Sequence, residues 1–208
     1  MKLAEKTVKE YLDLLGSDAP VPGGGSASAL CGAQGAALVA MVAGLSVGKA
    51  KYAQYQELYP KTIEAATKIK EELINQADRD TEAYNLVMQA YKLPKDTDEE
   101  REYRTTSITS ATRLATQVPF DTMKYCLGGL RVTQKLVGCS NVNAASDLGV
   151  AALNLLAGVK GAWQNVLINL QGLNEEKELI KYRKEGERIV WEAEMMAEEI
   201  YRAVIKNM

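Results

Sequence analysis

The residues from Ala27 to Val47 form a run of 21 positions without a charged side chain, directly after the glycine-rich segment PVPGGGS. A run of this length can cross a bilayer or form the buried helix of a soluble bundle. Most of its side chains are small (Ala, Gly, Ser), which gives weak membrane insertion and suits helices that approach each other closely. We therefore expect a bundle with a central helix of small residues and no membrane association.

The rest of the chain also has helical periodicity, and no segment shows the alternating, β-branched pattern that predicts strands. Apolar residues three and four positions apart predict helices over about 3–15, 26–49 and 61–92, and the last helix carries an apolar stripe from Tyr182 to Val204. The expected fold is all-α, an antiparallel helical bundle with a long C-terminal helix. The 208 residues (1–208) predict a single domain.

Two helix starts are predicted from capping residues. Thr97 lies three residues before Glu100, which is the spacing of a capping box, and Ser146 can cap a fifth helix that continues to about Leu170. The helix that follows Thr97 contains Pro119, where we expect it to kink or restart.

The chain contains no histidine, and its formal net charge is -2. The missing histidine excludes Ser-His-Asp, Cys-His and His-ligated metal chemistry, so any acid or base must be a carboxylate, Lys, Tyr or Cys. Both signs of charge are spread along the chain without a basic stripe, which makes nucleic acid an unexpected partner. We expect no metal site.

The three cysteines, Cys31, Cys126 and Cys139, are far apart and odd in number. They are expected to be reduced and mostly buried. The first 15 residues carry charges throughout and lack the apolar core of a signal peptide, so a cytoplasmic protein is expected.

Asp80 is the strongest catalytic candidate, because it falls on the apolar stripe of the third predicted helix in line with Leu73, Ala77 and Tyr84. A carboxylate that faces a core has a raised pKa, in the range useful for proton transfer. The alternative is an Asp paired with a basic side chain in a structural network. Asp78 lies off this line and is expected to be an ordinary surface charge.

Further polar candidates lie at helix ends and along the fifth helix. Backbone N–H groups of a glycine-rich turn at a helix start can bind an anion, although a tight loop would look the same. The polar row on the fifth helix either lines a cavity or bonds to neighbouring helices. Lys49 and Tyr52 could meet an anionic ligand group, or simply form a solvated helix end. The candidates are Gly23, Gly24, Gly25, Ser26, Lys49, Tyr52, Asp147, Asn165 and Asn169.

Five segments, in order, make the chain similar to one family, the cyclodeaminase/cyclohydrolase family of tetrahydrofolate enzymes. They are PVPGGGSASA, DTEAY followed by LPKDTDEE, QVPFD, SDLGVAA and GAWQNVLINL. Each alone is a weak signal, but five in register over most of the chain support the assignment.

The resemblance implies an all-helical homodimer with folate sites at or near the subunit interface. It implies Asp80 as the catalytic residue, and substrate contacts from Gly23 to Ser26, from Lys49, and from the polar residues Asp147, Asn165 and Asn169. A tetrahydrofolate derivative is the expected substrate, with no cofactor. The family also includes bifunctional enzymes, whose formiminotransferase half has no counterpart in this chain.

Two reactions share the intermediate 5,10-methenyltetrahydrofolate. The leading expectation is formiminotetrahydrofolate cyclodeaminase, which forms the methenyl compound and ammonia. The alternative is methenyltetrahydrofolate cyclohydrolase, which interconverts the methenyl and 10-formyl compounds. One carboxylate of raised pKa serves either reaction. A non-catalytic folate-binding or scaffold bundle is the second alternative.

Overall fold

A computed structural model of the chain describes residues 2–206, which form helices, turns and loops and no strand. This confirms the all-α prediction. In chain order the elements are the 3-10 helix η1 (Leu3–Glu5), α1 (Val8–Leu15), α2 (Gly24–Gly44), the 3-10 helix η2 (Ala50–Tyr55), α3 (Leu58–Tyr91), α4 (Asp98–Gln134), the 3-10 helix η3 (Val142–Ala144), α5 (Ala145–Leu170) and α6 (Glu176–Lys206).

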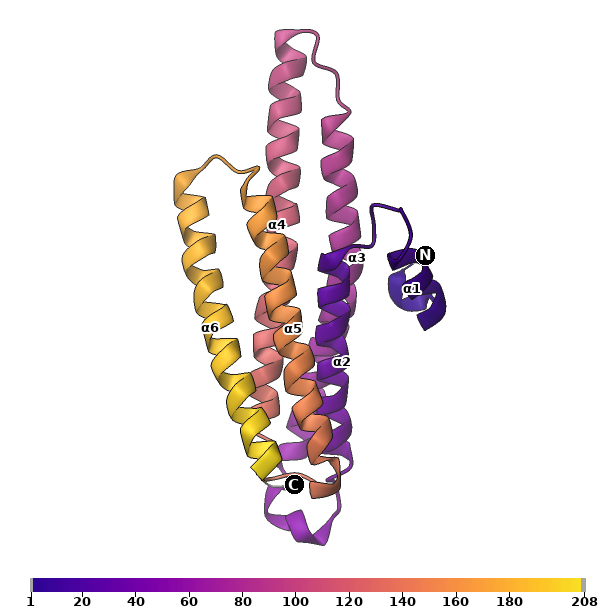
Figure 1. Ribbon diagram of the computed structural model, residues 1–208, viewed down its shortest axis with the longest axis vertical. Helices are drawn as coiled ribbons and strands as arrows, with labels where there is room; N and C mark the ends of the chain where they lie inside the picture. The colour runs from indigo at the N-terminus through magenta and orange to yellow at the C-terminus, as the bar shows by residue number, and fades with distance from the viewer. Residues whose placement is uncertain (1, 207–208) are drawn as a thin grey trace.

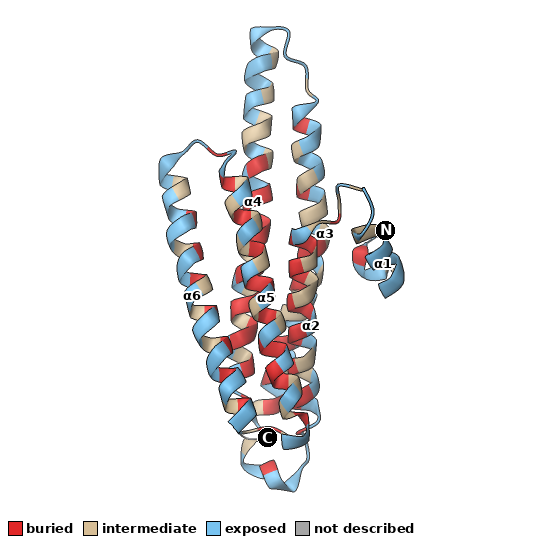
Figure 2. Cartoon of the chain, in the orientation of Figure 1, coloured by how far each residue is buried: buried red, intermediate tan, exposed pale blue. Residues whose placement is uncertain are grey.

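The four helices α2 to α5 form a closed ring in which α2 contacts both α3 and α5, and α4 does the same (Figure 1). Gly24 lies beside Asn165 and Gly35 beside Ala151, so α2 and α5 run antiparallel. The helix α6 packs outside the ring against α5 and α4, and α1 lies to one side of α2 and α3 (Figure 1). Buried residues run along all four helices of the ring and along one side of α6, as Figure 2 shows.

Glycines bring α2 close to its neighbours, as its small side chains predict. A Cβ on Gly35 would lie 2.7 Å from Leu155 Cγ, and one on Gly158 would lie 2.7 Å from Cys126 Sγ and 3.1 Å from the carbonyl oxygen of Ser28. Real Cβ atoms essentially never approach within 3.0 Å of another atom, so α2, α4 and α5 could not pack at these distances with larger residues at these positions.

The helix α2 is not enclosed on all sides. One stripe of its residues is exposed and lies beside an exposed stripe of α5. Between the two stripes, Cys31 Sγ lies 3.4 Å from the carbonyl oxygen of Asn154. We call this surface the α2–α5 face; its exposed residues are Gln34, Ala37, Met41, Leu45, Val150, Ala157, Gln164 and Ile168. The face carries apolar and neutral polar side chains and no charge.

By length and composition α2 and the segment Val142–Leu170 could each cross a membrane. About half of each apolar stretch is buried within the bundle (50% and 44%). This is the property expected of core helices in a helical bundle, so their length is weak evidence for membrane spans.

The second helix is shorter than predicted at its C-terminal end. It ends at Gly44 rather than near Lys49, and a turn follows in which Gly48 has a φ of +71°. Glycine adopts a positive φ without strain, so Gly48 fits this turn. At the start of α3, Pro60 falls within the first turn, where its missing N–H has no helical partner to lose.

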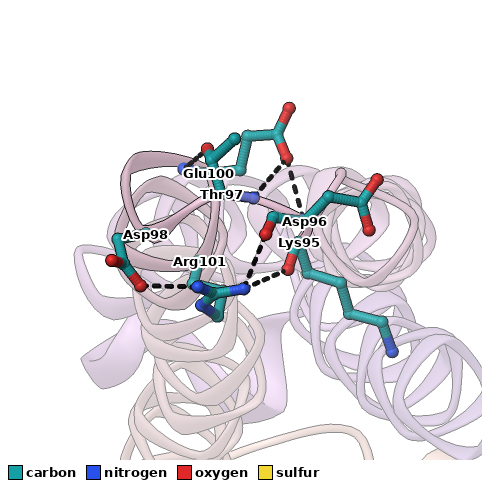
Figure 3. Close-up of polar contacts among 6 residues, drawn as sticks. All are labelled: Lys95, Asp96, Thr97, Asp98, Glu100 and Arg101. Atoms are coloured by element: carbon teal, nitrogen blue, oxygen red, sulfur yellow. Dashed lines mark hydrogen bonds and ion pairs between the residues drawn. The ribbon is translucent and has the colours of Figure 1, made fainter.

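The turn between α3 and α4 confirms the predicted capping box (Figure 3). The Glu100 backbone N–H donates to Thr97 Oγ1 at 3.1 Å, and Glu100 Oε2 accepts from the backbone N–H of Thr97 at 3.1 Å. Arg101 adds hydrogen bonds to the carbonyl oxygens of Lys95 and Asp96. These contacts close the end of a hairpin that projects beyond α5 and α6 (Figure 1).

Of the two expectations at Pro119, a kink or a restart, the restart is wrong, because α4 continues through this residue without interruption. Pro119 has no N–H to donate to the carbonyl oxygen of Ala115, one turn earlier. Asn169 of α5 supplies the missing donor, since its Nδ2 lies 2.6 Å from that oxygen. A side chain from another helix therefore completes the hydrogen bonding of α4.

The predicted cap of the fifth helix is also wrong. Ser146 lies inside the first turn of α5, whose N-cap is Ala144 without a side-chain hydrogen bond. The chain enters α5 from the short helix η3, and Asn141 caps η3 by accepting from the backbone N–H of Asn143 at 3.2 Å. The polar turn before α5 is present, but its capping side chain is Asn141, which caps η3 rather than α5.

Candidate functional site

Asp80 of α3 and Ser26 of α2 form the central contact of the candidate site. The backbone N–H of Ser26 donates to Asp80 Oδ2 at 2.8 Å, and Ser26 Oγ lies 3.0 Å from the same oxygen. Ser26 Oγ also lies 2.9 Å from the carbonyl oxygen of Ala77. Because the N-cap of α2 is Gly23, Asp80 receives its hydrogen bonds from the first turn of that helix, where the dipole favours an anion.

Gly25 leaves the space that this contact requires. A Cβ at this position would overlap Asp80 Oδ1 and lie 2.5 Å from Cγ. The glycine therefore lets a carboxylate approach the backbone at the start of α2. The glycine-rich segment is expected to bring backbone N–H groups to an anion, and in this structure the carboxylate bound there is that of Asp80.

The pKa of Asp80 is raised above its ordinary value of 3.8, mainly because burial removes water from the carboxylate. The hydrogen bonds from the Ser26 side chain and backbone act in the opposite direction, because they stabilise the ionised form. The side chain is half-buried, so it combines limited desolvation with access to solvent. A carboxylate with a raised pKa and access to solvent is a candidate for proton transfer.

Asn165 of α5 lies on the other side of the same helix start. A Cβ on Gly24 would be 3.5 Å from Asn165 Nδ2, an ordinary contact. The same nitrogen donates to the carbonyl oxygen of Gly161 at 2.9 Å, which holds the amide in place. The structure thus brings Gly24, Gly25, Ser26, Asp80 and Asn165 together.

Three other candidates lie at the opposite end of the bundle. The helix α2 is about 30 Å long, and Lys49 follows its C-terminus. Because α5 is antiparallel, Asp147 in its first turn lies at that same end. Tyr52 is buried there, and its hydroxyl accepts from the backbone N–H of Val142 at 3.0 Å. Within one chain, these residues are far from Asp80.

Asn169 lies near the Asp80 end, but its amide already has a structural partner. Its Nδ2 completes the backbone of α4 at Ala115, as described above. Of the two explanations for the polar row on α5, bonds to neighbouring helices account for Asn169, while Asn154 contacts Cys31. The amide of Asn165 bonds within its own helix.

Asp78 is not the ordinary surface charge that we expected. Its Oδ1 accepts from the backbone N–H of Leu3 at 2.8 Å, and its Oδ2 is buried without a hydrogen-bond partner in the described part of the chain. Leu3 packs in a small cluster with Ala29 and Ala77, behind the contact between Ser26 and Asp80. The N-terminal segment is therefore anchored two residues from Asp80, by a contact across 75 positions that spacing along the helix could not reveal.

The cysteines agree with the expectation of reduced thiols. All three are free; Cys126 is buried, and Cys31 and Cys139 are half-buried. Burial raises the pKa of the Cys126 and Cys31 thiols, which keeps them protonated and unreactive at neutral pH.

A sequence model of the family described as formiminotransferase-cyclodeaminase matches residues 7–188. The chain belongs to this family. The matched range includes every residue that forms the candidate site and all four helices of the ring, from α2 to α5. This confirms the resemblance found in the sequence.

Individual relatives carry two different activities in their names. A methenyltetrahydrofolate cyclohydrolase from Methylorubrum extorquens is 38% identical over 199 residues, which cover 96% of each protein. A formimidoyltransferase-cyclodeaminase from Rattus norvegicus is 33% identical over 183 residues, and the match covers 87% of this chain but 34% of the rat protein. The chain therefore corresponds to about a third of the bifunctional enzyme.

A solved structure shows the same fold at full length. The crystal structure of a formiminotetrahydrofolate cyclodeaminase from Thermotoga maritima superposes with a TM-score of 0.81 at 29% identity, and the match covers 99% of this chain and 97% of the other. The relatives similar to this chain are therefore named for both activities. The chain is a folate one-carbon enzyme of the cyclodeaminase/cyclohydrolase family.

Proposed function

We propose that the protein catalyses acid–base chemistry at the one-carbon unit that bridges N5 and N10 of tetrahydrofolate, with Asp80 as both base and acid. The observation that carries the proposal is the Asp80 carboxylate at the start of α2, held by Ser26 and raised in pKa by burial. A group that must take up a proton and return it works best with a pKa near the working pH.

Of the two family reactions, we propose hydrolysis of 5,10-methenyltetrahydrofolate as the main activity. Cyclodeamination is the leading expectation from the sequence alone, but the similarity to the Methylorubrum cyclohydrolase, which covers 96% of both proteins, favours hydrolysis. Cyclodeamination remains the second candidate, and the likeness to the Thermotoga cyclodeaminase over nearly the whole chain favours it.

In the hydrolytic reaction, ionised Asp80 removes a proton from water as its oxygen attacks the cationic methenyl carbon. The new C–O bond gives a tetrahedral adduct that still bridges N5 and N10. Protonated Asp80 then returns its proton to N5 as the C–N5 bond breaks, and the hydroxyl of the adduct loses its proton to solvent. The product is 10-formyltetrahydrofolate with net release of one proton.

In the second candidate reaction, Asp80 moves a proton between two nitrogens. N10 attacks the carbon of the protonated N5-formimino group and loses its proton to the carboxylate; the departing nitrogen takes that proton, and ammonia leaves to give the methenyl cation. Gly24 and Asn165 border the Asp80 carboxylate in either case. We propose that the first-turn N–H groups of α2 and the Asn165 amide orient the substrate there.

An absorbance assay tests the proposal, because 5,10-methenyltetrahydrofolate absorbs near-ultraviolet light that the other two compounds do not. Loss of the methenyl signal at a rate above the uncatalysed one indicates the cyclohydrolase, and its formation from the formimino substrate, with ammonia, indicates the cyclodeaminase. Asp80→Asn with full activity in both assays would refute the role of Asp80. A scaffold protein would be inactive and would give no heat of binding with a folate in calorimetry.

We also propose that the functional unit is a homodimer built through the α2–α5 face. The face is uncharged and partly apolar, and its small residues permit close helix packing, as in many subunit interfaces. A twofold axis across two antiparallel helices places the start of α2 in one subunit near the end of α2 in the other. Lys49 and Asp147 of one chain would then approach Asp80 of the other, which would reunite candidates that lie about 30 Å apart within one chain.

We propose that the enzyme works in the cytoplasm, with tetrahydrofolate derivatives as its substrates and no resident cofactor. The reactions consist of proton transfers, the attack of a neutral nucleophile and the departure of a protonated nitrogen, all of which carboxylates and amides can assist. Sedimentation of the purified chain measures the oligomeric state, and an active monomer would contradict the interface site.

A further inference from the structure

The side chain of Gln76 has no hydrogen-bond partner although it lies in the core of the bundle. The residue is 1% exposed, and neither Nε2 nor Oε1 bonds to any group in residues 2–206. An amide that is buried without partners costs free energy comparable to several ordinary hydrogen bonds. Such a group in a well-packed core requires a reason other than stability.

Gln76 lies one helical turn before Asp80 on the same face of α3. Positions four apart on a helix stand one above the other, and side chains lean toward the N-terminal end of the helix. The Asp80 carboxylate leans in this direction, since Ser26 Oγ is within hydrogen-bonding distance of both Asp80 Oδ2 and the carbonyl oxygen of Ala77. The carboxylate therefore lies over the turn that carries Gln76.

Asp80 has one oxygen that lacks a partner. Both hydrogen bonds from Ser26 reach Oδ2, and none from residues 2–206 reaches Oδ1. A Gln and an Asp at this spacing on a helix are within reach of each other, directly or through one water. Each has what the other lacks, because Gln76 offers a donor and Oδ1 an acceptor.

We propose that Gln76 is a positioning residue for the proposed Asp80 chemistry, which bonds Asp80 Oδ1 through an ordered water beneath the carboxylate. The inference rests on the proposed function. A carboxamide suits this task because it has both a donor and an acceptor. Its N–H group can donate a hydrogen bond that stabilises the ionised carboxylate, and its carbonyl oxygen can accept a hydrogen bond from the protonated acid. The backbone N–H of Ser26, by contrast, can only donate, so its bond to Asp80 Oδ2 favours the ionised form.

Few charged groups face Asp80 from the neighbouring helices, so a hydrogen bond from Gln76 would have a measurable effect on the pKa of Asp80. The helix α2 has no charged residue, and on α4 Asp121 pairs with Lys124 at 3.3 Å. On α5, Lys160 pairs with Glu194 of α6. On α3 itself, Asp78 is held by Leu3. Burial accordingly raises the pKa of Asp80, and the hydrogen bonds from Ser26 lower it.

The test replaces Gln76 with Leu, which keeps the volume and removes the amide. We expect kcat to fall between about 10-fold and 100-fold, because a displaced catalytic group loses its alignment. The acid limb of the pH profile of kcat/KM should move to higher pH, because the ionised carboxylate loses a donor. The melting temperature should stay the same or rise, since an unpaired amide has been removed. Thr133→Val is the matched control: Thr133 is fully buried and its hydroxyl donates to the carbonyl oxygen of Gly129, at the other end of α4.

A Gln76→Leu protein with unchanged kcat and an unchanged pH profile would overturn the inference, whatever its melting temperature. Gln76→Met, which is unbranched like Gln, gives the same readout if the Leu variant does not fold. Failure of both to fold, with Thr133→Val folded, would also overturn it, because Gln76 would then be a packing residue. Asp80→Asn is assayed beside them. Its full activity would remove the proposed function itself, whereas an inactive Asp80→Asn with a normal Gln76→Leu would remove only this inference.

Discussion

Gly25 and Asp80 meet so closely that no Cβ fits between them: one built on Gly25 would lie 2.5 Å from Asp80 Cγ and 2.7 Å from Oδ2. The backbone of one helix therefore touches the carboxylate of another. The carboxylate is flexible, whereas the start of α2 is fixed by the packing of its glycines against α4 and α5. Any side chain at position 25 must displace Asp80.

The first prediction is that Gly25→Ala inactivates the enzyme without unfolding it. The new methyl group would move the Asp80 carboxylate and break its bonds to Ser26, and such a shift should lower kcat/KM by about 100-fold or more. Alanine is favoured over glycine in helices by up to about 1 kcal/mol, which offsets part of the strain. The control is Gly128→Ala, whose Cβ would be 3.8 Å from Ile69 Cδ1 and fits without movement. Equal activity of both variants would show that Asp80 need not occupy its present position.

The second prediction concerns Ser26→Ala, which keeps the backbone N–H bond to Asp80 and removes the hydroxyl. The side-chain hydrogen bond lowers the pKa of Asp80, so its loss should raise that pKa and move the acid limb of the kcat/KM profile to higher pH. Stability should fall by about 1 kcal/mol through the lost bond to Ala77. Ser46→Ala is the matched control, because Ser46 is buried in the turn after α2 and its hydroxyl donates to the carbonyl oxygen of Val42. A shift of the profile in both variants would point to a general effect on α2.

The third prediction is a pH-dependent gain of stability in Asp80→Asn. The pKa of Asp80 is higher in the folded than in the unfolded chain, so the folded protein binds more protons between the two values. Wild-type stability therefore falls as pH rises through this interval and is constant above it. The Asn variant escapes this cost, so it should be the more stable protein at pH 8, and the two should converge near pH 3.8. Urea unfolding across this range measures the difference. A variant that is less stable at every pH would show that the Ser26 hydrogen bonds outweigh burial.

The sequence predicted the parts of this molecule that depend on neighbours along the chain. The helical stripes, the capping box at Thr97 and the inward position of Asp80 all follow from spacings of three or four residues. The fold class follows from the same periodicity. These features depend on local geometry, which a single sequence contains.

Several errors arise from contacts between residues far apart in the chain. The continuity of α4 through Pro119 depends on Asn169, which lies 54 positions from Ala115. The role of Asp78 depends on its contact with Leu3, 75 positions away. The separation of Lys49 and Asp147 from Asp80 became visible only when the direction of each helix was known. Gln76 was missed although its spacing from Asp80 was visible, because a single polar residue on a stripe has no distinctive pattern.

The fourth prediction tests whether Asn169 supports α4 or contacts the substrate. Asn169→Leu leaves the carbonyl oxygen of Ala115 without a donor and should destabilise the protein by about 1–3 kcal/mol. In a Pro119→Ala background the new backbone N–H can donate to the same oxygen, so the cost of Asn169→Leu should nearly vanish. A double-mutant cycle of urea unfolding energies measures this coupling. If the double mutant recovers stability and still has a raised KM, Asn169 contacts folate as well.

The fifth prediction concerns the proposed dimer, in which each site combines Asp80 of one subunit with Lys49 of the other. Asp80→Asn and Lys49→Ala should each be nearly inactive alone. When equal amounts of the two are unfolded and refolded together, half of the dimers are mixed, and each mixed dimer regains one intact site of two. The mixture should therefore recover about a quarter of the wild-type activity, whereas sites contained within single chains would recover none. Lys61→Ala, another exposed lysine at the same end of the bundle, is the control for loss of surface charge. A Lys49→Ala protein with wild-type activity would remove Lys49 from the site and leave the interface to be tested by sedimentation.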